Sequence, residues 1–272
     1  MPVSIDERIL YNHDIHVHTT LSECCSDLAA TPERVIARAA RLGIKTVGFA
    51  NHFWDESIPG ASTWYESQNL EHILTIRAQI PEDTHGVNVL VGCESEYCGD
   101  GVVGISREVA EQLDFVLLPM SHFHMTGFVV QQWQVANSRN VAELLVQRFR
   151  EVIELGIANG IAHPFSPLGF KDSVDEIFGY ISDETFQDCF GRAAELGVSI
   201  EIQPNMLPGS LGKEMEGFHD ESFMRVLAIA RDMGCMFHLG SDTHTLVGTG
   251  NTLKLKPYLD ELAIHPDQFC SF

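Results

Sequence analysis

The chain has 272 residues, of which 44% are hydrophobic, and its 17 Lys and Arg against 38 Asp and Glu give a formal net charge of −21. This excess of acidic residues repels phosphate backbones, so it argues against a protein that binds nucleic acid and favours a small-molecule partner. The hydrophobic fraction is sufficient for one large core, and we expect a single domain over residues 1–272.

Neither membrane insertion nor secretion is expected. No stretch reaches the roughly 20 apolar residues that a membrane-spanning helix needs, and the N-terminal segment MPVSIDERILYNHDIH lacks the apolar centre of a signal peptide. The seven cysteines are scattered, and their odd number does not fit a disulfide framework. We therefore expect reduced cysteines and a cytoplasmic location.

Apolar runs of strand length alternate with helical patterns along the chain. The first strand is predicted at 9–17, and the helix after it has Thr31 as N-cap, Pro32 at its first position and Gly43 past its end. Further strands are predicted at 46–50, 87–91, 115–118, 157–162, 198–202 and 236–239.

Three longer helical patterns lie between the later strands. They are predicted at 141–155 with Asn140 as N-cap, at 183–196 and at 220–233, and each is followed by a glycine. Strands that alternate with helices favour a parallel sheet with both faces covered. Seven such units without a break favour a closed or nearly closed (β/α)7 barrel, with a doubly wound open sheet as the alternative.

Every predicted strand ends in an imidazole or carboxylate side chain. In chain order these are Asp14, His16, His18, His52, Glu94, Glu96, His122, His124, His163, Glu201, Asp242 and His244. The C-terminal strand ends form the face where barrels build their active sites. Imidazole nitrogens and carboxylate oxygens are the usual ligands of zinc, manganese and iron. Residues two apart on a strand point the same way, so neighbouring pairs can bind one ion.

A single histidine at a strand end is more often a hydrogen-bonded structural residue than a ligand. Matching residues on at least six of seven strands are not explained in this way, so the set as a whole predicts a metal centre. For His124 we favour a structural role. The remaining histidines are interpreted as structural or solvated: His13, His72, His85, His219, His238 and His265.

These residues, in this order, resemble the PHP (polymerase and histidinol phosphatase) superfamily. The motifs that carry the resemblance are DIHVHT, FANHFW, GCESEY, SHF, AHP and GSDTH, and they span nearly the whole chain. Their length and order are similar to the stand-alone histidinol-phosphatase-like branch. The resemblance implies a distorted, TIM-like (β/α)7 barrel and a metal-dependent phosphoesterase.

The resemblance also implies two or three divalent ions, which we expect to be zinc, manganese or iron. One ion would bind His16, His18, Glu94 and Asp242, a second His122 and His163 with Glu94 as bridge, and a third His52, His244 and the residue eight positions after His16. That residue is Cys24, where family members often have histidine. A thiolate there would shift the preference towards zinc or iron, whereas a thiol that only fills space would leave two ions.

Two further positions depart from the family's pattern. Asn51 stands where the family usually has Asp, which weakens a partner of a metal ligand but removes no ligand. Histidinol-phosphate enzymes carry an Asn-Thr-x-Gly-Leu-Arg-like segment after the sixth strand. Here residues 204–213 replace it without an arginine, which argues against histidinol phosphate as the substrate.

The expected reaction is hydrolysis of a phosphate ester of a small molecule by a hydroxide that bridges the ions. The ions would neutralise charge on the phosphoryl oxygens, and Asp242 or His244 would pass a proton to the leaving group. Glu96 either orients a histidine ligand or is solvated. Lys171 and Lys213 are candidates for binding the anionic substrate, with surface lysines as the alternative.

Two other functions stay open at this point. The same metal barrel is compatible with hydrolysis of an amide or carboxylic ester, and a non-catalytic metal-binding or regulatory barrel is the third hypothesis. The near-complete set of ligands argues against the last of these. The leaving group, the native metal and the oligomeric state are not predicted.

Overall fold

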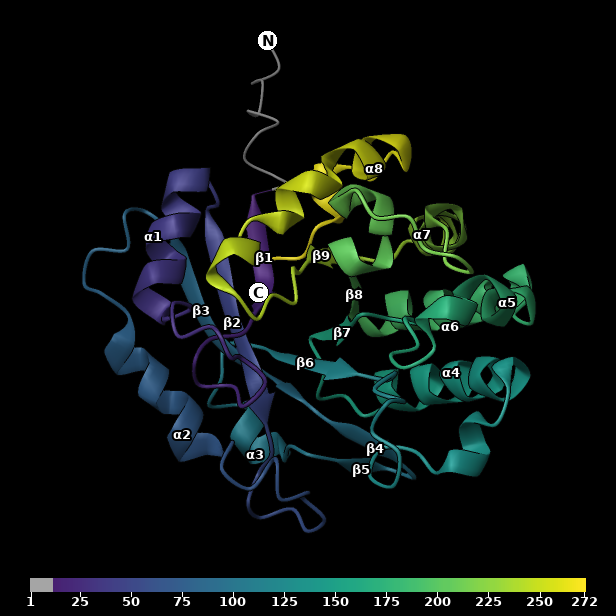
Figure 1. The fold of residues 1–272 in the computed structure, drawn as a ribbon, viewed down its shortest axis with the longest axis horizontal. Coiled ribbons are helices and arrows are strands. Elements are labelled where there is room, and N and C mark those ends of the chain that lie inside the picture. Colours follow the sequence, from purple (N-terminus) through teal and green to yellow (C-terminus); the bar gives the residue numbers. More distant parts are fainter. Residues whose placement is uncertain (1–11) are drawn as a thin grey trace.

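Seven parallel strands form the centre of the molecule (Figure 1). The computed structural model describes residues 12–272, and its main sheet has the order β1-β2-β3-β6-β7-β8-β9. The strands are β1 (His13–Val17), β2 (Thr46–Phe53), β3 (Asn88–Ser95), β6 (Val116–Pro119), β7 (Gly160–Ala162), β8 (Ser199–Ile202) and β9 (Phe237–Leu239). All neighbouring pairs are parallel.

The sheet curls until its first strand meets the segment that follows its last strand. The amide of His18 donates to the Thr243 carbonyl at 3.0 Å, and the amide of Asp242 donates to the His16 carbonyl at 2.8 Å. Val17 and Thr243 form a parallel bridge. These bonds nearly close the barrel, so the (β/α)7 prediction is confirmed and the open doubly wound sheet is wrong.

Helices cover the outside of the barrel (Figure 1). They are α1 (Pro32–Leu42), α2 (Leu70–Leu74), α3 (Arg107–Ala110), α4 (Ser138–Ile153), α5 (Val174–Gly179), α6 (Asp183–Leu196), α7 (Asp220–Asp232) and α8 (Lys256–Glu261). A small hairpin of β4 (Tyr97–Gly99) and β5 (Val102–Val103) follows β3. Within residues 12–272, no helix combines the length and apolar composition that crossing a membrane requires.

Helix boundaries follow the capping residues. α1 and α6 have their predicted bounds, and the glycines that end them, Gly43 and Gly197, adopt left-handed φ angles of 81° and 70°. α4 begins at Ser138, ahead of its predicted start. The reason is that Asn137, and not Asn140, is the N-cap: its side chain accepts a hydrogen bond from the Asn140 amide at 3.0 Å.

Two strands are longer at their C-terminal ends than predicted. β2 and β3 pair residue by residue from Thr46 and Asn88 to Phe53 and Ser95. The strands therefore include polar residues that point into the barrel and interrupt the apolar run in the sequence. The predicted start of the first strand at 9–11 lies outside the described residues.

The floor of the barrel is apolar and lies below the polar strand ends. Ile15, Phe115 and Leu117 are buried there, and the ring of Phe272 packs on Phe115 with 5.5 Å between ring centroids. β3 packs so closely on Phe115 that only glycine fits at position 92: a Cβ there would lie 2.5 Å from the Phe115 carbonyl oxygen. This close packing gives the polar side chains above it a fixed base.

Candidate metal centre

The C-terminal strand ends bring the predicted metal ligands together. They come from β1 and the loop after it, from β2 and β3, and from the segments after β6, β7 and β9: His16, His18, Cys24, His52, Glu94, His122, His163, Asp242 and His244. Most are buried, whereas Cys24, Asp242 and His244 are partly exposed at the mouth of the barrel.

Glu94 lies at the centre of this group. Its Oε2 atom faces three imidazole nitrogens: His16 Nε2 at 3.3 Å, His18 Nε2 at 3.4 Å and His52 Nδ1 at 3.2 Å. Its Oε1 atom faces two more: His163 Nε2 at 3.0 Å and His122 Nε2 at 3.6 Å. One carboxylate between two sets of imidazoles has the position of a bridging ligand.

Asp242 lies beside the two histidines at the end of β1. Its Oδ1 atom lies 3.4 Å from His18 Nε2 and 3.6 Å from His16 Nε2. Asp242 and His163 both have positive φ angles, 50° and 32°, which residues other than glycine rarely adopt. Such conformations cost on the order of 1–3 kcal/mol each and cluster at functional sites.

Three sets of ligand atoms are compact enough to surround a cation. Within each set the atoms lie within 4.8 Å of one another: His16, His18 and Glu94; Glu94, His122 and His163; and His18, Cys24, His52 and His244. Zinc bonds of roughly 2.0–2.3 Å place ligands at such separations. His52 Nδ1 is buried and makes no hydrogen bond, as is typical of an imidazole nitrogen that binds a cation. The donors therefore fit divalent metal ions.

Electrostatics support the same interpretation. Burial alone raises the pKa of Glu94, but the neighbouring His16 and His52 outweigh it and hold that pKa well below its usual value. Burial, together with Glu94 and Asp242, raises the pKa of the Cys24 thiol well above its usual range. The protein alone thus keeps Cys24 protonated, and a bound cation is what makes such a thiol a thiolate.

Buried carboxylates orient two of the imidazoles. Glu201 Oε1 lies 2.8 Å from His16 Nδ1, and its Oε2 accepts a hydrogen bond from the His163 amide at 2.5 Å. Glu96 Oε2 lies 2.6 Å from His122 Nδ1 and accepts the Tyr65 hydroxyl hydrogen bond at 3.0 Å. Contacts at Nδ1 leave Nε2 free to face a metal. Glu96 is fully buried, which favours the orienting role over a solvated one.

Hydroxyl groups support the β1 ligands in the same way. Ser22 Oγ lies 3.1 Å from His18 Nδ1 and donates to Asn51 Oδ1 at 3.0 Å. Asn51 Oδ1 also accepts from the amide and hydroxyl of Thr19, at 2.8 and 3.1 Å. The amide at position 51 thus acts as an acceptor that fixes the loop after β1 and, through Ser22, the ring of His18.

The partners of the ligands were only partly foreseen from the sequence. Glu201 was noted at a strand end without a role, although a glutamate between two isoleucines on a strand indicates a side chain turned into the barrel. Ser22 and Tyr65 were missed, because loop residues carry no periodic pattern that indicates which way they point.

The chain is similar over most of its length to proteins named probable phosphatases. No protein-family model matches the chain. A probable phosphatase of Aliivibrio fischeri is 24% identical over 92% of this chain and 84% of its own length. The probable phosphatase YcdX of Escherichia coli O81 is 25% identical over 95% of this chain and 89% of its own length.

A solved structure shares the fold. The histidinol phosphate phosphatase of Lactococcus lactis, crystallised with zinc, L-histidinol and phosphate, superposes with a TM-score of 0.63 at 16% identity, over 94% of this chain and 95% of that one. The names of these relatives and the shared barrel agree with the resemblance that the six motifs carry.

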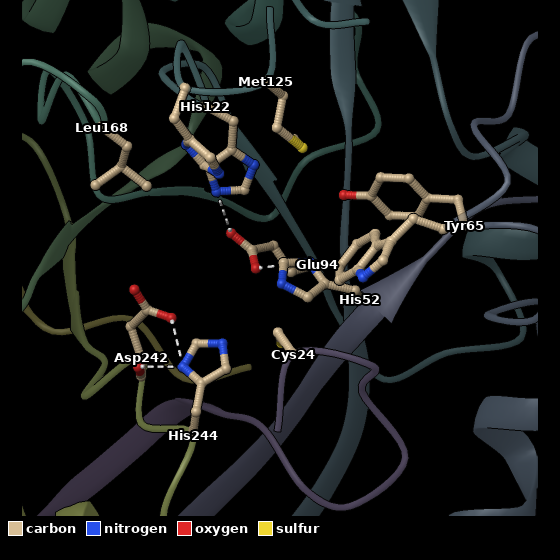
Figure 2. Close-up of a pocket in the computed structure, with 11 residues that line it drawn as sticks. Cys24, His52, Tyr65, Glu94, His122, Met125, Leu168, Asp242 and His244 are labelled. Atoms are coloured by element: carbon tan, nitrogen blue, oxygen red, sulfur yellow. Dashed lines mark hydrogen bonds and ion pairs between the residues drawn. The ribbon is translucent and has the colours of Figure 1, made fainter. Parts of the chain in front are cut away.

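The mouth of the site opens into a cavity of about 370 Å³ (Figure 2). Its apolar wall is formed by Trp64, Met125 and Leu168. Its polar wall contains six of the candidate ligands: Cys24, His52, Glu94, His122, Asp242 and His244. Trp64 lies against His52 with 5.0 Å between ring centroids. The cavity therefore borders the candidate metal centre directly and is of the size that small-molecule sites have.

The two predicted substrate-binding lysines are near Asp242. Burial lowers the pKa of Lys171, the Asp242 carboxylate raises it and the charge of Lys213 lowers it, so Lys171 is within electrostatic reach of both. Lys213 lines an adjoining cavity together with Asp242 and His244. Both positions are compatible with an anionic ligand.

The other histidines of the described chain are not among the candidate ligands. His124 lines the mouth 5.5 Å from the His122 ring, but it belongs to none of the three sets of ligand atoms. Burial and the charge of His122 lower its pKa to about 4. Four of the rest have other partners: His13 with Leu239, His72 with Leu21, His219 with Asp175 and His238 with Ser199.

Proposed function

We propose that this protein is a metal-dependent phosphoesterase that hydrolyses a phosphate monoester of a small molecule. The observation that carries the proposal is the convergence of imidazoles on the Glu94 carboxylate, beside a set of three histidines and the Cys24 thiol. Relatives named probable phosphatases over nearly the whole chain support it.

The ligand set supports two or three divalent ions, and we propose zinc, manganese or iron. Glu94 joins the set that contains His16 to the set that contains His122, and the set with Cys24 supplies a third position. Mixed imidazole, carboxylate and thiolate ligands suit these metals. When bound, such ions lower the pKa of a coordinated water towards neutrality and neutralise charge on phosphoryl oxygens.

Asp242 and His244 are the residues that we assign to proton transfer. Their side chains are 18% and 34% exposed, so a leaving group at the mouth reaches both. His244 Nδ1 donates to the Asp242 carbonyl at 3.1 Å, which leaves Nε2 on the cavity side. With two ions bound, Nε2 would hold or give up a proton; with a third ion bound, Nε2 would be its ligand and Asp242 would transfer the proton. The His244 ring stacks on His18 at 4.2 Å, and this contact fixes its orientation.

Other side chains hold the substrate and exclude water. Lys171 and Lys213 are proposed to bind the anionic substrate, because Lys213 lines a cavity together with Asp242 and the Asp242 carboxylate raises the pKa of Lys171. Trp64, Met125 and Leu168 form an apolar wall that keeps bulk water from the reacting group. Residues 204–213 contain no arginine, and Lys213 is their one cationic side chain. We therefore do not propose histidinol phosphate as the substrate.

We also propose a cytoplasmic location. The support is the state of the cysteines: all seven lie in the described part of the chain, and all are free. Free thiols are typical of a reducing compartment.

The proposal is tested by hydrolysis assays on one preparation whose metal content is measured. Phosphate monoesters should be hydrolysed, chelator should abolish this activity, and Mn²⁺, Zn²⁺ or Fe²⁺ should restore it. A Glu94→Gln variant purified in the same way controls for contaminating phosphatases. Full activity in a metal-free sample would refute the mechanism, and amidase or carboxylesterase activity without phosphatase activity would favour the alternative hydrolase.

A further inference from the structure

A second cavity adjoins the candidate metal centre. It has a volume of about 420 Å³, and its wall includes Asp242 and His244, which also line the cavity of Figure 2. The two spaces therefore meet at these side chains. The rest of the wall comes from the segment after β8 and from the 3-10 turns after β9. A ligand at the metal centre thus has open space beside it on this side.

Polar and basic side chains line this second cavity. Its hydrogen-bonding and charged side chains include Asn205, Lys213, Thr245, Asn251 and Lys254. Asp242, a candidate metal ligand, is the one carboxylate in the described wall. Neither Lys213 nor Lys254 forms an ion pair with another residue of the described chain.

The concentration of lysines at this place is unusual for the chain. The sequence contains five lysines in all, at positions 45, 171, 213, 254 and 256, in a protein with 38 acidic residues. Two of the five, Lys213 and Lys254, line the second cavity. Like charges held together without carboxylate partners repel one another, and a bound anion removes that repulsion.

We propose that the second cavity binds a second anionic group, phosphate or carboxylate, carried by the leaving group of the substrate. The inference rests on the proposed function, because it places the reacting phosphoryl group at the metal centre. Lys213 and Lys254 then determine specificity through charge, and Asn205 and Asn251 supply neutral hydrogen bonds. The substrate class is a phosphate monoester with two separated anionic ends.

The test uses substrate pairs that differ in the second anion. Glycerol 3-phosphate is compared with 3-phosphoglycerate, and fructose 6-phosphate with fructose 1,6-bisphosphate, which together cover a short and a long separation. Steady-state kinetics on the metal-loaded protein give KM and kcat for each. We expect the doubly anionic member of at least one pair to have a KM about tenfold lower than its partner.

Substitution of the lysines then tests whether they cause the preference for the doubly anionic substrate. Lys254→Met should raise the KM of the preferred doubly anionic substrate about fivefold, with kcat nearly unchanged, because one exposed charge contact is lost. The KM of its singly anionic partner should stay within twofold. Lys256→Met is the matched control: this lysine lies two positions away and pairs with Asp260 at 2.7 Å on α8. It should change neither KM.

Binding measurements separate this inference from the proposed function. Titration calorimetry with the same pairs reports affinity whether or not hydrolysis occurs. Tighter binding of the doubly anionic member, lost in Lys213→Met and Lys254→Met, supports the second cavity even if no monoester is hydrolysed. Hydrolysis of all four compounds with equal KM, or a preference that survives both substitutions, would overturn the inference and leave the phosphoesterase intact.

Discussion

At the scale of single residues, Cys24 is the position that sets this site apart from the pattern of the family. Its thiol belongs to a set of atoms with His18, His52 and His244, and the protein alone keeps it protonated. A thiolate adds a negative charge, so it binds its cation more tightly and makes that cation a weaker Lewis acid than an imidazole does.

We predict that Cys24→Ala loses one bound ion, whereas Cys24→His keeps the wild-type number and changes the metal preference. Elemental analysis of protein loaded with zinc, manganese or iron measures both. Cys25→Ala is the control, because the Cys25 thiol points elsewhere and donates to the His244 carbonyl at 3.1 Å. An identical ion count in wild type and Cys24→Ala would show that the cysteine only fills space.

A second prediction at this scale concerns Glu96, which we regard as a positioning residue. Glu96→Gln keeps the shape but removes the negative charge beside His122 Nδ1. We expect the affinity for one ion, and with it kcat/KM, to fall roughly 10–100-fold. The melting temperature should change little, which separates this effect from unfolding. Tyr65→Phe, which removes the other hydrogen bond to Glu96, should have a smaller effect in the same direction.

At the scale of elements, Asp175 connects α5 to α7. Its Oδ1 atom accepts hydrogen bonds from the His219 amide at 3.1 Å and the Ser222 hydroxyl at 2.5 Å, and its Oδ2 atom lies 2.6 Å from His219 Nδ1. Burial alone raises the pKa of Asp175, but these hydrogen bonds outweigh it and lower that pKa. The carboxylate therefore stabilises the start of α7.

We predict that Asp175→Asn lowers the free energy of unfolding by about 1 kcal/mol at neutral pH. The pKa is lower in the folded protein than the value of about 3.9 in the unfolded chain. The contribution is therefore present above pH 4 and is lost as the pH falls through the folded value. Urea unfolding at several pH values tests this, with the exposed Asp172→Asn as control. If the difference in unfolding free energy between wild type and Asp175→Asn stays the same at acidic pH, the prediction is contradicted.

Strands and helices were predictable where the pattern is local. The barrel followed from alternating apolar runs and helical periods, and the end of α1 followed from Gly43. The ends of β2 and β3 were not predictable in this way, because inward polar residues such as His52 and Glu94 interrupt the apolar run while the backbone stays paired. The start of α4 was misplaced because two asparagines compete as N-cap and only the folded backbone selects between them.

The candidate site was likewise predictable only where the pattern in the sequence is local. Strand ends could be collected from the sequence because a parallel barrel brings them to one face. The contact of Glu96 with Tyr65 joins residues 31 positions apart, through a loop whose course no periodicity indicates. Such contacts depend on the path of the chain between elements, and a single sequence does not encode that path in a visible pattern.

At the scale of the whole molecule, the candidate metal centre lies between elements that the sheet leaves weakly connected. His18 follows the first strand and His244 follows the last, and backbone bonds between these segments replace a regular ladder. Ions that bind both segments act as a cross-link at the seam of the barrel. Stability of the protein should therefore depend on metal.

We predict that chelation lowers the melting temperature by about 5–10 °C for each ion lost. A ligand present at about 100 times its Kd stabilises the folded state by about 2.7 kcal/mol, and about 1 kcal/mol corresponds to roughly 2–4 °C in a protein near this size. Calorimetry with and without chelator measures the shift, and re-addition of zinc should reverse it. An unchanged melting temperature after complete loss of metal would contradict the prediction.

The left-handed backbone at Asp242 has a consequence for anyone who evolves this protein in the laboratory. In a chelating buffer the aspartate only costs stability there, since glycine or asparagine adopts the same φ angle of 50° more easily. A library screened for heat resistance alone would then accumulate such replacements, and these proteins would be heat-resistant but inactive if Asp242 has the role proposed above. A screen that demands turnover in every round would retain the aspartate and tolerate its strain.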